Sequence, residues 1–370
     1  MAGLGRGVIE RYVLRELAVP IAAATVVLLA LFYAMVLVRG VDFLLGSAAQ
    51  PLDWLTLGNA MLPMLVPQVL PLSFLIGVMM GFARLGEDGE LTALAAVGVS
   101  PVRLLRPVLL LALACCAVLS VTIFAWKPWG MQVMRQTARD VIERNILGDL
   151  QPGSVRADLP GVVFAAETVS PGPTWGGVVM IDERDGRGTQ VLTAPRASAS
   201  FETGVGISLQ QGTVIQREAG DELLTTTFER GTVLFNVADA LNRRDTFRFG
   251  HEELSPIDLL DRAREAEAGG GSGVGFRSAF HLRLSQLVAP LALALVATAV
   301  ALAGRRRGAR TAALIAFGVY LGWFVLSRVA VQLGEKGAVA PPVAGWSALV
   351  LTVIVGALAL AWVSRRGARR

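Results

Sequence analysis

The chain has few of the side chains that build metal centres, disulfide frameworks or catalytic triads. Among its 370 residues there are only two cysteines and two histidines. Cys115 and Cys116 are adjacent within one apolar run, so we interpret them as small packing residues. His251 and His281 lie far from them in sequence. Because no spacing of metal ligands is present, we expect neither a metal nor a cofactor.

The sequence also lacks the motifs of nucleotide hydrolysis and acyl transfer. It contains no G-x-x-x-x-G-K-[ST] loop and no G-x-S-x-G elbow. No carboxylate pair or nucleophile triad lies on a clear scaffold. We therefore predict that the chain is not an enzyme, and that any ATP it uses is hydrolysed by another chain. We expect no nucleic-acid partner.

Charged residues are scarce, whereas long apolar runs are abundant. Hydrophobic residues make up 54% of the chain and charged residues 17%. Six runs are long enough to cross a hydrocarbon core of about 30 Å. They are Leu17–Val38, Leu55–Phe82, Arg103–Trp126, Leu284–Ala303, Thr311–Leu333 and Val343–Val363. The pattern predicts an α-helical membrane protein with six transmembrane helices.

The second run is distinguished by its prolines. Pro63, Pro67 and Pro71 recur every four residues, so they share one face of a helix and remove backbone donors from it. We predict a kinked span. Two interpretations remain open: neighbouring helices accommodate the kinks, or the span forms a flexible wall of a cavity.

The placement of arginine predicts the topology. Arginines gather in the N-terminal segment, in the 84–106 loop, in the 304–310 loop and at the C-terminus. With six spans these segments all fall on one side, which the positive-inside rule assigns to the cytoplasm. We therefore predict a multi-pass protein of a bacterial inner membrane, with both termini cytoplasmic and the segment after the third span periplasmic.

That segment, about residues 153–253, differs from the rest in composition. Short alternating runs of Val, Thr, Phe and Gly appear between turn residues, which predicts an all-β domain resembling a sandwich or jelly roll. We interpret it as a binding or bridging module. Ser255 with Pro256 predicts a short helix after it, and Gly269–Gly273 a flexible linker.

These patterns divide the chain into three parts. Residues 1–130 are expected to hold spans one to three. Residues 131–275 are expected to hold the periplasmic jelly-roll-like domain with flanking helices and linker, and residues 276–370 spans four to six.

A polar stretch interrupts the apolar runs between spans two and three. Glu87 and Glu90 crowd the start of a short helical pattern over about residues 87–97, where a helix N-terminus favours negative charge. Leu91 and Leu94 give it an apolar face, and Gly98 suits its C-terminal end. From the pattern alone, this helix is either a solvated connection or a docking helix for a cytoplasmic partner.

Several motifs resemble those of the LptF/LptG (YjgP/YjgQ) family of lipopolysaccharide-export permeases over nearly the whole chain. They are Arg11–Glu16 (RYVLRE), Leu37–Arg39, Leu70–Ser73 (LPLS) and, most specifically, Gly89–Leu94 (GELTAL) continuing to Gly98–Ser100. Leu209–Thr213 (LQQGT) and Glu335–Gly337 look more like LptF than LptG. The Gly269–Gly273 segment departs from the pattern expected of the family.

The resemblance implies a function that the residues alone do not. The chain would be a permease subunit of an ATP-driven ABC transporter that extracts lipopolysaccharide from the inner membrane. It would pair with an LptG-like permease above an LptB-like ATPase dimer, and pass the lipid to a periplasmic bridge that begins with an LptC-like single-span protein and leads to outer-membrane assembly. Glu87, Glu90, Leu91 and Leu94 would then belong to the coupling helix.

Candidate lipid contacts lie in the membrane and in the β domain. Arg39 ends the first span, and Arg328 lies about 7–8 Å inside the outer end of the fifth. A cation at that depth either snorkels to the headgroups or faces a polar cavity, where its planar fork would suit a phosphate. Phe164, Ile207 and Leu223 are expected to line an apolar slot in the β domain.

Two other classes of protein remain as alternatives. A mechanotransmission-type ABC permease of the MacB/FtsX kind has four spans and places its outer domain after the first. A membrane-bound lipid-modifying enzyme would need a clustered acid, base or metal site at the interface.

Overall fold

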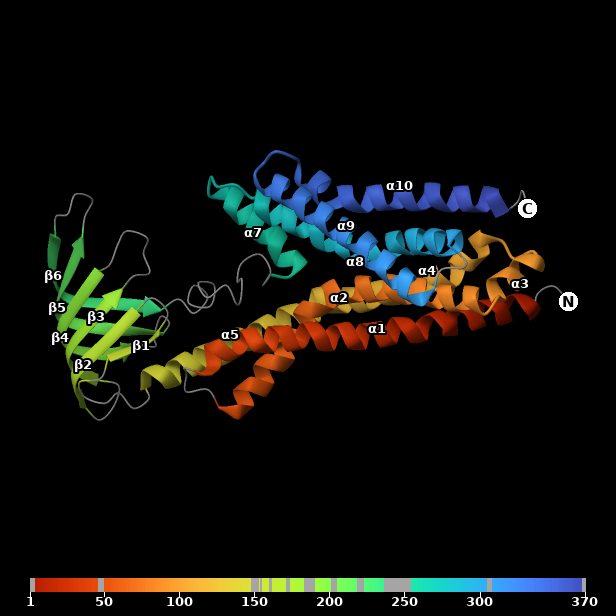
Figure 1. Ribbon diagram of the computed structural model, residues 1–370. Helices are drawn as coiled ribbons and strands as arrows, with labels where there is room; N and C mark the ends of the chain where they lie inside the picture. Colours follow the sequence, from red (N-terminus) through yellow and green to blue (C-terminus); the bar gives the residue numbers. More distant parts are fainter. Residues whose placement is uncertain are drawn as a thin grey trace. The chain divides into compact units, whose positions relative to one another are not determined.

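The computed structural model describes most of the chain (Figure 1). The described residues are 4–45, 50–147, 153, 155–159, 162–170, 174–182, 190–200, 205–217, 223–235, 254–304 and 308–367. They form two compact units. One comprises residues 1–34, 61–130 and 253–370, and the other residues 35–60 and 131–252.

Long helices dominate the described chain, and six of them are long and apolar enough to cross a membrane. The long helices are α1 (Leu4–Leu45), α2 (Pro51–Glu87), α4 (Pro101–Val121), α5 (Lys127–Leu147), α8 (Val274–Ala303), α9 (Ala309–Glu335) and α10 (Pro341–Gly367). A single π-helical turn, Thr122–Trp126, joins α4 to α5 without a break. Two short helices, α3 (Glu90–Ala96) and α7 (Pro256–Ala268), complete the set. The six predicted spans are confirmed, each within a longer helix.

The N-terminal half of α1 packs closely on α2 because α2 carries glycines there. Gly77 and Gly81 are four residues apart and so share one helix face. A Cβ at Gly77 would overlap the backbone of Ile21, and one at Gly81 would lie 2.6 Å from the Leu17 side chain. Small residues at this spacing let two membrane helices approach backbone to backbone.

The prolines of α2 lie within a continuous helix, and a side chain of α9 contacts its backbone between two of them. Pro63, Pro67 and Pro71 are all internal to α2. A proline disturbs the preceding turn and weakens the bonding of its carbonyls. The hydroxyl of Tyr320, from α9, donates a 2.8 Å hydrogen bond to the carbonyl of Gln68, three residues before Pro71. The hydrogen bond therefore joins the proline-containing segment of α2 to α9.

The segment between α7 and α8 is a compact turn, in contrast to the predicted flexible linker. The N–H groups of Gly269, Gly270 and Gly271 all donate to carbonyls in the last turns of α7, and Gly270 takes a left-handed φ of 78°. Across the turn, Arg277 binds Glu267 at 2.7 and 2.8 Å. The glycines serve as a helix C-cap, a role that composition alone does not distinguish from a linker. The predicted Ser255 cap is confirmed, with a full capping box.

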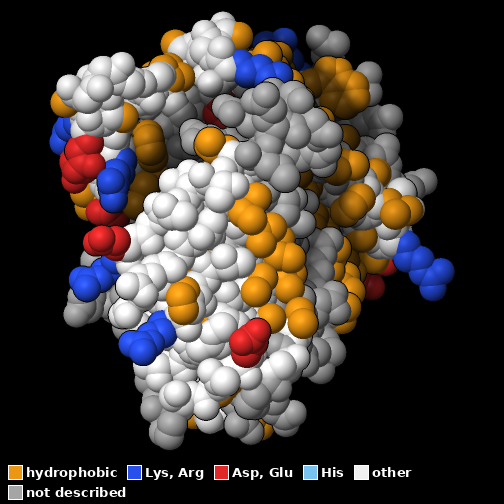
Figure 2. Space-filling model, turned by 90° about the vertical axis from the view of Figure 1, so that its left-hand side faces the viewer, with side chains coloured by type: hydrophobic (Ala, Val, Ile, Leu, Met, Phe, Trp, Pro, Cys, Tyr) orange, Lys and Arg blue, Asp and Glu red, His pale blue; other side chains and the backbone are white. Residues whose placement is uncertain are grey.

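The inserted all-β domain is confirmed as a six-stranded antiparallel sheet. Its strands are β1 (Val155–Leu159), β2 (Val162–Ser170), β3 (Thr174–Asp182), β4 (Gln190–Ser200), β5 (Val205–Arg217) and β6 (Leu223–Phe235). Each strand pairs with the next one in sequence, so the described strands form a meander with β1 and β6 at the edges. Figure 2 shows acidic and basic side chains interspersed along the left margin of the face that it presents, and a stripe of hydrophobic side chains nearer its centre.

A crease crosses the sheet from β2 to β6. The pairing registers bring Glu167, Gly177, Pro195, Gln211 and Glu229 into one row across the strands. Gly177 and Gln211 both have left-handed φ values, 60° and 54°. The alternation of buried residues shifts by one position at this row. The same concave face therefore stays apolar on both sides of the crease.

The two halves of the sheet fold toward each other along the crease. Phe164 pairs with Met180, which is five residues from Trp175 along β3. That separation is about 16 Å in a flat strand. The rings of Phe164 and Trp175 nevertheless meet edge to face, with centroids 5.3 Å apart. One folded sheet thus provides the two layers and the single core that a jelly-roll-like domain requires.

Candidate functional site

The short helix predicted over residues 87–97 is present, but it is shorter than expected at its acidic end. The helix α3 covers Glu90–Ala96, and Gly89 precedes it with a left-handed φ of 77°. Glu87 is the last residue of α2, because that helix continues further than the composition suggested. Gly98 ends the segment with a φ of 80°, as predicted for a glycine cap. Only Glu90 of the predicted acidic residues therefore belongs to α3.

The apolar face of α3 is turned toward its own chain. Leu91 is 2% exposed, and Leu94 packs beside it against the same core. The opposite face carries only short side chains, all exposed: Thr92, Ala93, Ala95 and Ala96. Short side chains leave room for the groove of a partner to approach the helix backbone. The leucines hold α3 on the bundle, while the small face is available for a partner.

A polar network joins the start of α1 to the elements around α3. The hydroxyl of Tyr12 donates to the carboxylate of Glu90, with oxygen distances of 2.9 and 2.7 Å. Glu16 lies 3.5 Å from Arg84 near the end of α2, and Glu10 lies 3.6 Å from Arg106 in α4. Sequence reasoning did not identify this network. The RYVLRE motif contains two of its members, but nothing in that motif reveals which residues they contact.

The two candidate lipid-contact arginines differ in how far the structure describes them. The side chain of Arg39 lies outside the described part, although its backbone is within α1. Arg328 is exposed, and its guanidinium lies 5.2 Å from the centre of the Phe324 ring. Phe324 in turn stacks on Tyr320, with ring centroids 6.1 Å apart. Within the described residues Arg328 forms no ion pair, so its charge is available to a ligand.

Two of the three predicted residues of the β domain share one core. Phe164 and Ile207, which are 4% and 2% exposed, belong to the apolar cluster on the concave face of the sheet. Leu223 begins β6, but its side chain lies outside the described part of the structure. The concave face is closed by its own side chains, so an apolar ligand would have to separate the two halves of the sheet to enter it.

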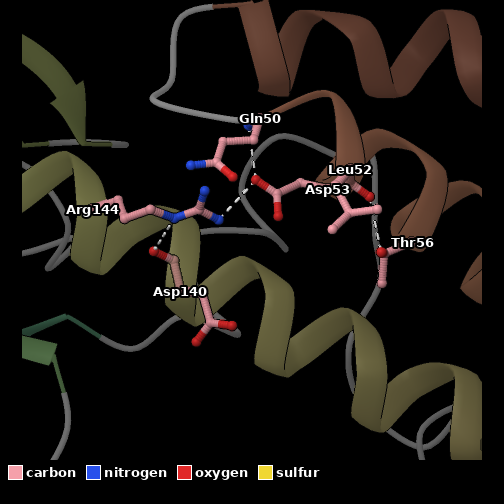
Figure 3. Close-up of polar contacts among 6 residues, drawn as sticks. All are labelled: Gln50, Leu52, Asp53, Thr56, Asp140 and Arg144. Atoms are coloured by element: carbon pink, nitrogen blue, oxygen red, sulfur yellow. Dashed lines mark hydrogen bonds and ion pairs between the residues drawn. The ribbon is translucent and has the colours of Figure 1, made fainter.

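A further ion pair, absent from our sequence reasoning, joins the start of α2 to the C-terminal part of α5 (Figure 3). A guanidinium nitrogen of Arg144 lies 2.7 Å from the carboxylate of Asp53. The same carboxylate accepts a bond from the Gln50 N–H, and Arg144 also donates to the Asp140 carbonyl. Both charged side chains are largely sheltered from solvent. The ion pair therefore links the start of α2 to the C-terminal part of α5.

The described residues contain no group of His, Cys, Asp or Glu that could hold a metal ion. The features that stand out are instead a docked surface helix, an exposed membrane arginine and a folded sheet with an apolar face. They are features of a membrane protein with six candidate spans and an inserted β domain.

Comparison with known proteins agrees with this class. The model of the family "Lipopolysaccharide export system permease LptF/LptG" matches residues 11–365, and the chain belongs to this family. Relatives include the lipopolysaccharide export system permease protein LptF of Escherichia coli K12 and that of Shigella flexneri. Each is 23% identical over 96% of this chain and 95% of its own length. The resemblance inferred from the sequence is confirmed, and the protein is a multi-pass inner-membrane permease.

Proposed function

We propose that the chain is one permease subunit of an ATP-driven ABC transporter that extracts lipopolysaccharide from the inner membrane and passes it to a periplasmic bridge. The observation that supports this best is α3, a short helix held between two spans in a chain that matches the permease family almost end to end. Its outward face suits a separate subunit. The relatives are named as lipopolysaccharide export permease proteins, and the same role is proposed here.

The helix α3 is the proposed contact with an LptB-like ATPase dimer. Its small face would lie in a groove of the ATPase, with the Glu90 carboxylate at the edge. Glu87, at the end of α2, would add a second negative charge close to Gly308 at the start of α9. Leu91 and Leu94 would act from the other side, by anchoring α3 to the bundle so that movement of the ATPase moves the spans.

The orientation proposed for the chain follows from its arginines. Both termini and α3 would be cytoplasmic, and residues 131–275, including the sheet, periplasmic. An LptG-like permease would cover part of the exposed apolar helices. The long edge strand β6, with Leu224 to Thr227 exposed, offers backbone groups to which a strand of an LptC-like protein could add.

The proposed lipid path has a polar part and an apolar part. Arg39 and Arg328 would hold phosphates of the anionic glycolipid on the outer side of the membrane, since an arginine fork binds phosphate through two hydrogen bonds. Phe164, Ile207 and Leu223 would meet the acyl chains when the folded sheet opens along its crease. The contact between Phe164 and Trp175 would be broken in that open state.

Site-specific photo-crosslinking tests this function. A diazirine amino acid of leucine size would be placed at Ile207, on the concave face, and as a control at Val179, which is 42% exposed on the other face. In vesicles that contain the whole transporter and lipopolysaccharide, Ile207 should capture lipid only when ATP is supplied, and Val179 should capture little. Equal capture at the two positions, or capture without ATP, would contradict the proposal.

Neither alternative class is favoured. A permease of the MacB/FtsX kind would carry its outer domain after the first of four spans, whereas here the sheet follows the third candidate span and three more come after it. A lipid-modifying enzyme would need clustered acids, bases or metal ligands. The described residues present no potential metal cluster.

A further inference from the structure

The N-terminal part of α1 contacts α2, α4 and the short helix α3. Its residues Val13 and Leu17 are completely buried against the bundle. The ion pairs of Glu10 and Glu16 reach α4 and α2. The remaining neighbour, α3, is reached through Tyr12, whose hydroxyl lies within 2.9 Å of both carboxylate oxygens of Glu90.

The helix α3 is attached to the chain in a way that permits it to move. Gly89 and Gly98 flank it in left-handed conformations, with φ values of 77° and 80°. Neither glycine has another atom within 4 Å of the position that a Cβ would occupy. Two such residues can absorb changes in backbone angle as hinges do. What holds α3 is then the leucine packing on one side and the bond from Tyr12 to Glu90 on the other.

A tyrosine is well suited to hold a carboxylate that must also meet a partner. Its neutral hydroxyl leaves the negative charge of Glu90 intact, whereas a lysine or arginine at position 12 would neutralise it. An ionised carboxylate can accept about four hydrogen bonds, so one donor leaves room for a cation of the ATPase. Glu90 can therefore bind α1 and a basic partner group at the same time.

We propose that Tyr12 is the positioning residue that transmits movement of α3 to α1. This inference rests on the proposed docking of the ATPase on α3. Displacement of α3 pulls on α1 through the Tyr12–Glu90 hydrogen bond. Because α1 crosses α2 closely at Gly77 and Gly81, the N-terminal half of α1 responds as one body with that neighbouring span. Tyr12 thus links ATP hydrolysis to lipid movement and contributes little to binding of the ATPase.

The test compares Tyr12→Phe with Glu90→Ala, the double variant and Tyr33→Phe in the complete reconstituted transporter. Tyr33 is a matched control because it lies on the same helix. Three quantities are measured: ATPase co-purification, the rate of ATP hydrolysis, and lipopolysaccharide moved per ATP. Tyr12 is 41% exposed and the substitution removes one oxygen, so folding should be unaffected. A thermal unfolding curve checks this.

We expect Tyr12→Phe to keep ATPase association and the rate of ATP hydrolysis near the wild-type values. The amount of lipid moved per ATP should fall by about threefold to tenfold. This is the effect expected from loss of a hydrogen bond to a charged group, reduced because solvent screens the exposed pair. In the Glu90→Ala background the substitution should add nothing, since its partner is gone. Tyr33→Phe should behave as wild type.

The outcomes separate the two proposals. If Glu90→Ala weakens association or transport while Tyr12→Phe changes nothing, the transmission role of Tyr12 is wrong and docking on α3 stands. A parallel fall in association, hydrolysis and transport for Tyr12→Phe would mean a structural role only, and also overturns the inference. If Glu90→Ala leaves association and transport unchanged, docking through α3 itself is wrong.

Discussion

Both halves of α1 contain apolar side chains, but the two halves differ in what covers those side chains. In the N-terminal half, Val13 and Leu17 are fully buried and Ile21 is 8% exposed. Further along, Val27 is 65% and Leu31 63% exposed. Only 6% of the most apolar window of this span is buried. Hydropathy therefore indicates that a segment can cross a membrane. It does not indicate whether the segment is surrounded by its own chain, by a partner or by lipid.

The difference arises from the neighbouring helix rather than from α1 itself. Gly77 and Gly81 remove side chains from α2 where the N-terminal half of α1 crosses it, so the backbones approach closely. Polar contacts from Glu10, Tyr12 and Glu16 then extend this contact beyond the apolar region. We infer that the rest of α1 is left for another molecule, and three predictions test this comparison.

The largest effect is expected from filling the glycine contact. Gly77→Leu would place its Cβ on the backbone of Ile21, which cannot move aside as a flexible side chain would. Overpacking of a well-packed site costs about 1–3 kcal/mol or more, and a clash with backbone belongs at the upper end. We expect loss of most folded protein in detergent, measured by size-exclusion profile and thermal unfolding.

Gly318→Leu provides the matched control for that variant. Gly318 is also a helical glycine within a span, in α9, but no atom lies within 4 Å of its Cβ position. It should fold as the wild type does. Equal loss of folded protein in the two variants would show that added bulk in any span is harmful, and that the crossing of α1 on α2 is not special.

The glycine contact also illustrates what the sequence could and could not reveal. The six spans and the Ser255 cap follow from periodicity, length and capping residues, which are local properties. The match of Gly77 to Ile21 is not local, because it depends on which helices become neighbours. The same holds for Tyr12 and Glu90, which are separated by 78 positions in the chain.

The sheet provides a second example of a feature that the sequence alone could not reveal. Alternating runs predict strands and an inserted β domain, but they do not predict the row of residues where the alternation shifts. Gly177 is a recognisable candidate for a left-handed position, whereas Gln211 is not. The crease becomes evident only when the registers place these two residues in one line. Likewise, composition suggested a linker at Gly269–Gly273, where hydrogen bonds form a helix cap.

An intermediate effect is expected at Arg328, on a helix face that the chain leaves uncovered. Arg328→Ala removes the charge, whereas Arg328→Lys keeps the charge but loses the fork. If this residue holds a phosphate of the lipid, Ala should reduce lipopolysaccharide co-purification and export by about threefold to tenfold, with solvent screening allowed for, and Lys by less. Mass spectrometry of bound lipid measures the effect. Unchanged binding and export in both variants would make Arg328 an interface anchor only.

The smallest effect on the chain itself is expected from Leu31→Ala, paired with Leu17→Ala on the same helix. The two substitutions remove the same atoms, one from a 63% exposed site and one from a fully buried site. Leu17→Ala should lower stability by about 1–3 kcal/mol, since the packing part of the loss remains where lipid replaces water. Leu31→Ala should change it by less than about 0.5 kcal/mol.

Co-purification of the second permease should respond to these two substitutions in the opposite order, with the larger effect from Leu31→Ala. If another subunit covers the exposed half of α1, Leu31→Ala removes packing from that contact and should lower co-purification of the second permease. Leu17→Ala should leave co-purification unchanged once it is normalised to folded protein, because Leu17 touches only its own chain. Equal destabilisation of the isolated chain by the two variants would mean that the outer half of α1 packs within its own chain. In that case the contrast between its halves would not mark a surface for a partner.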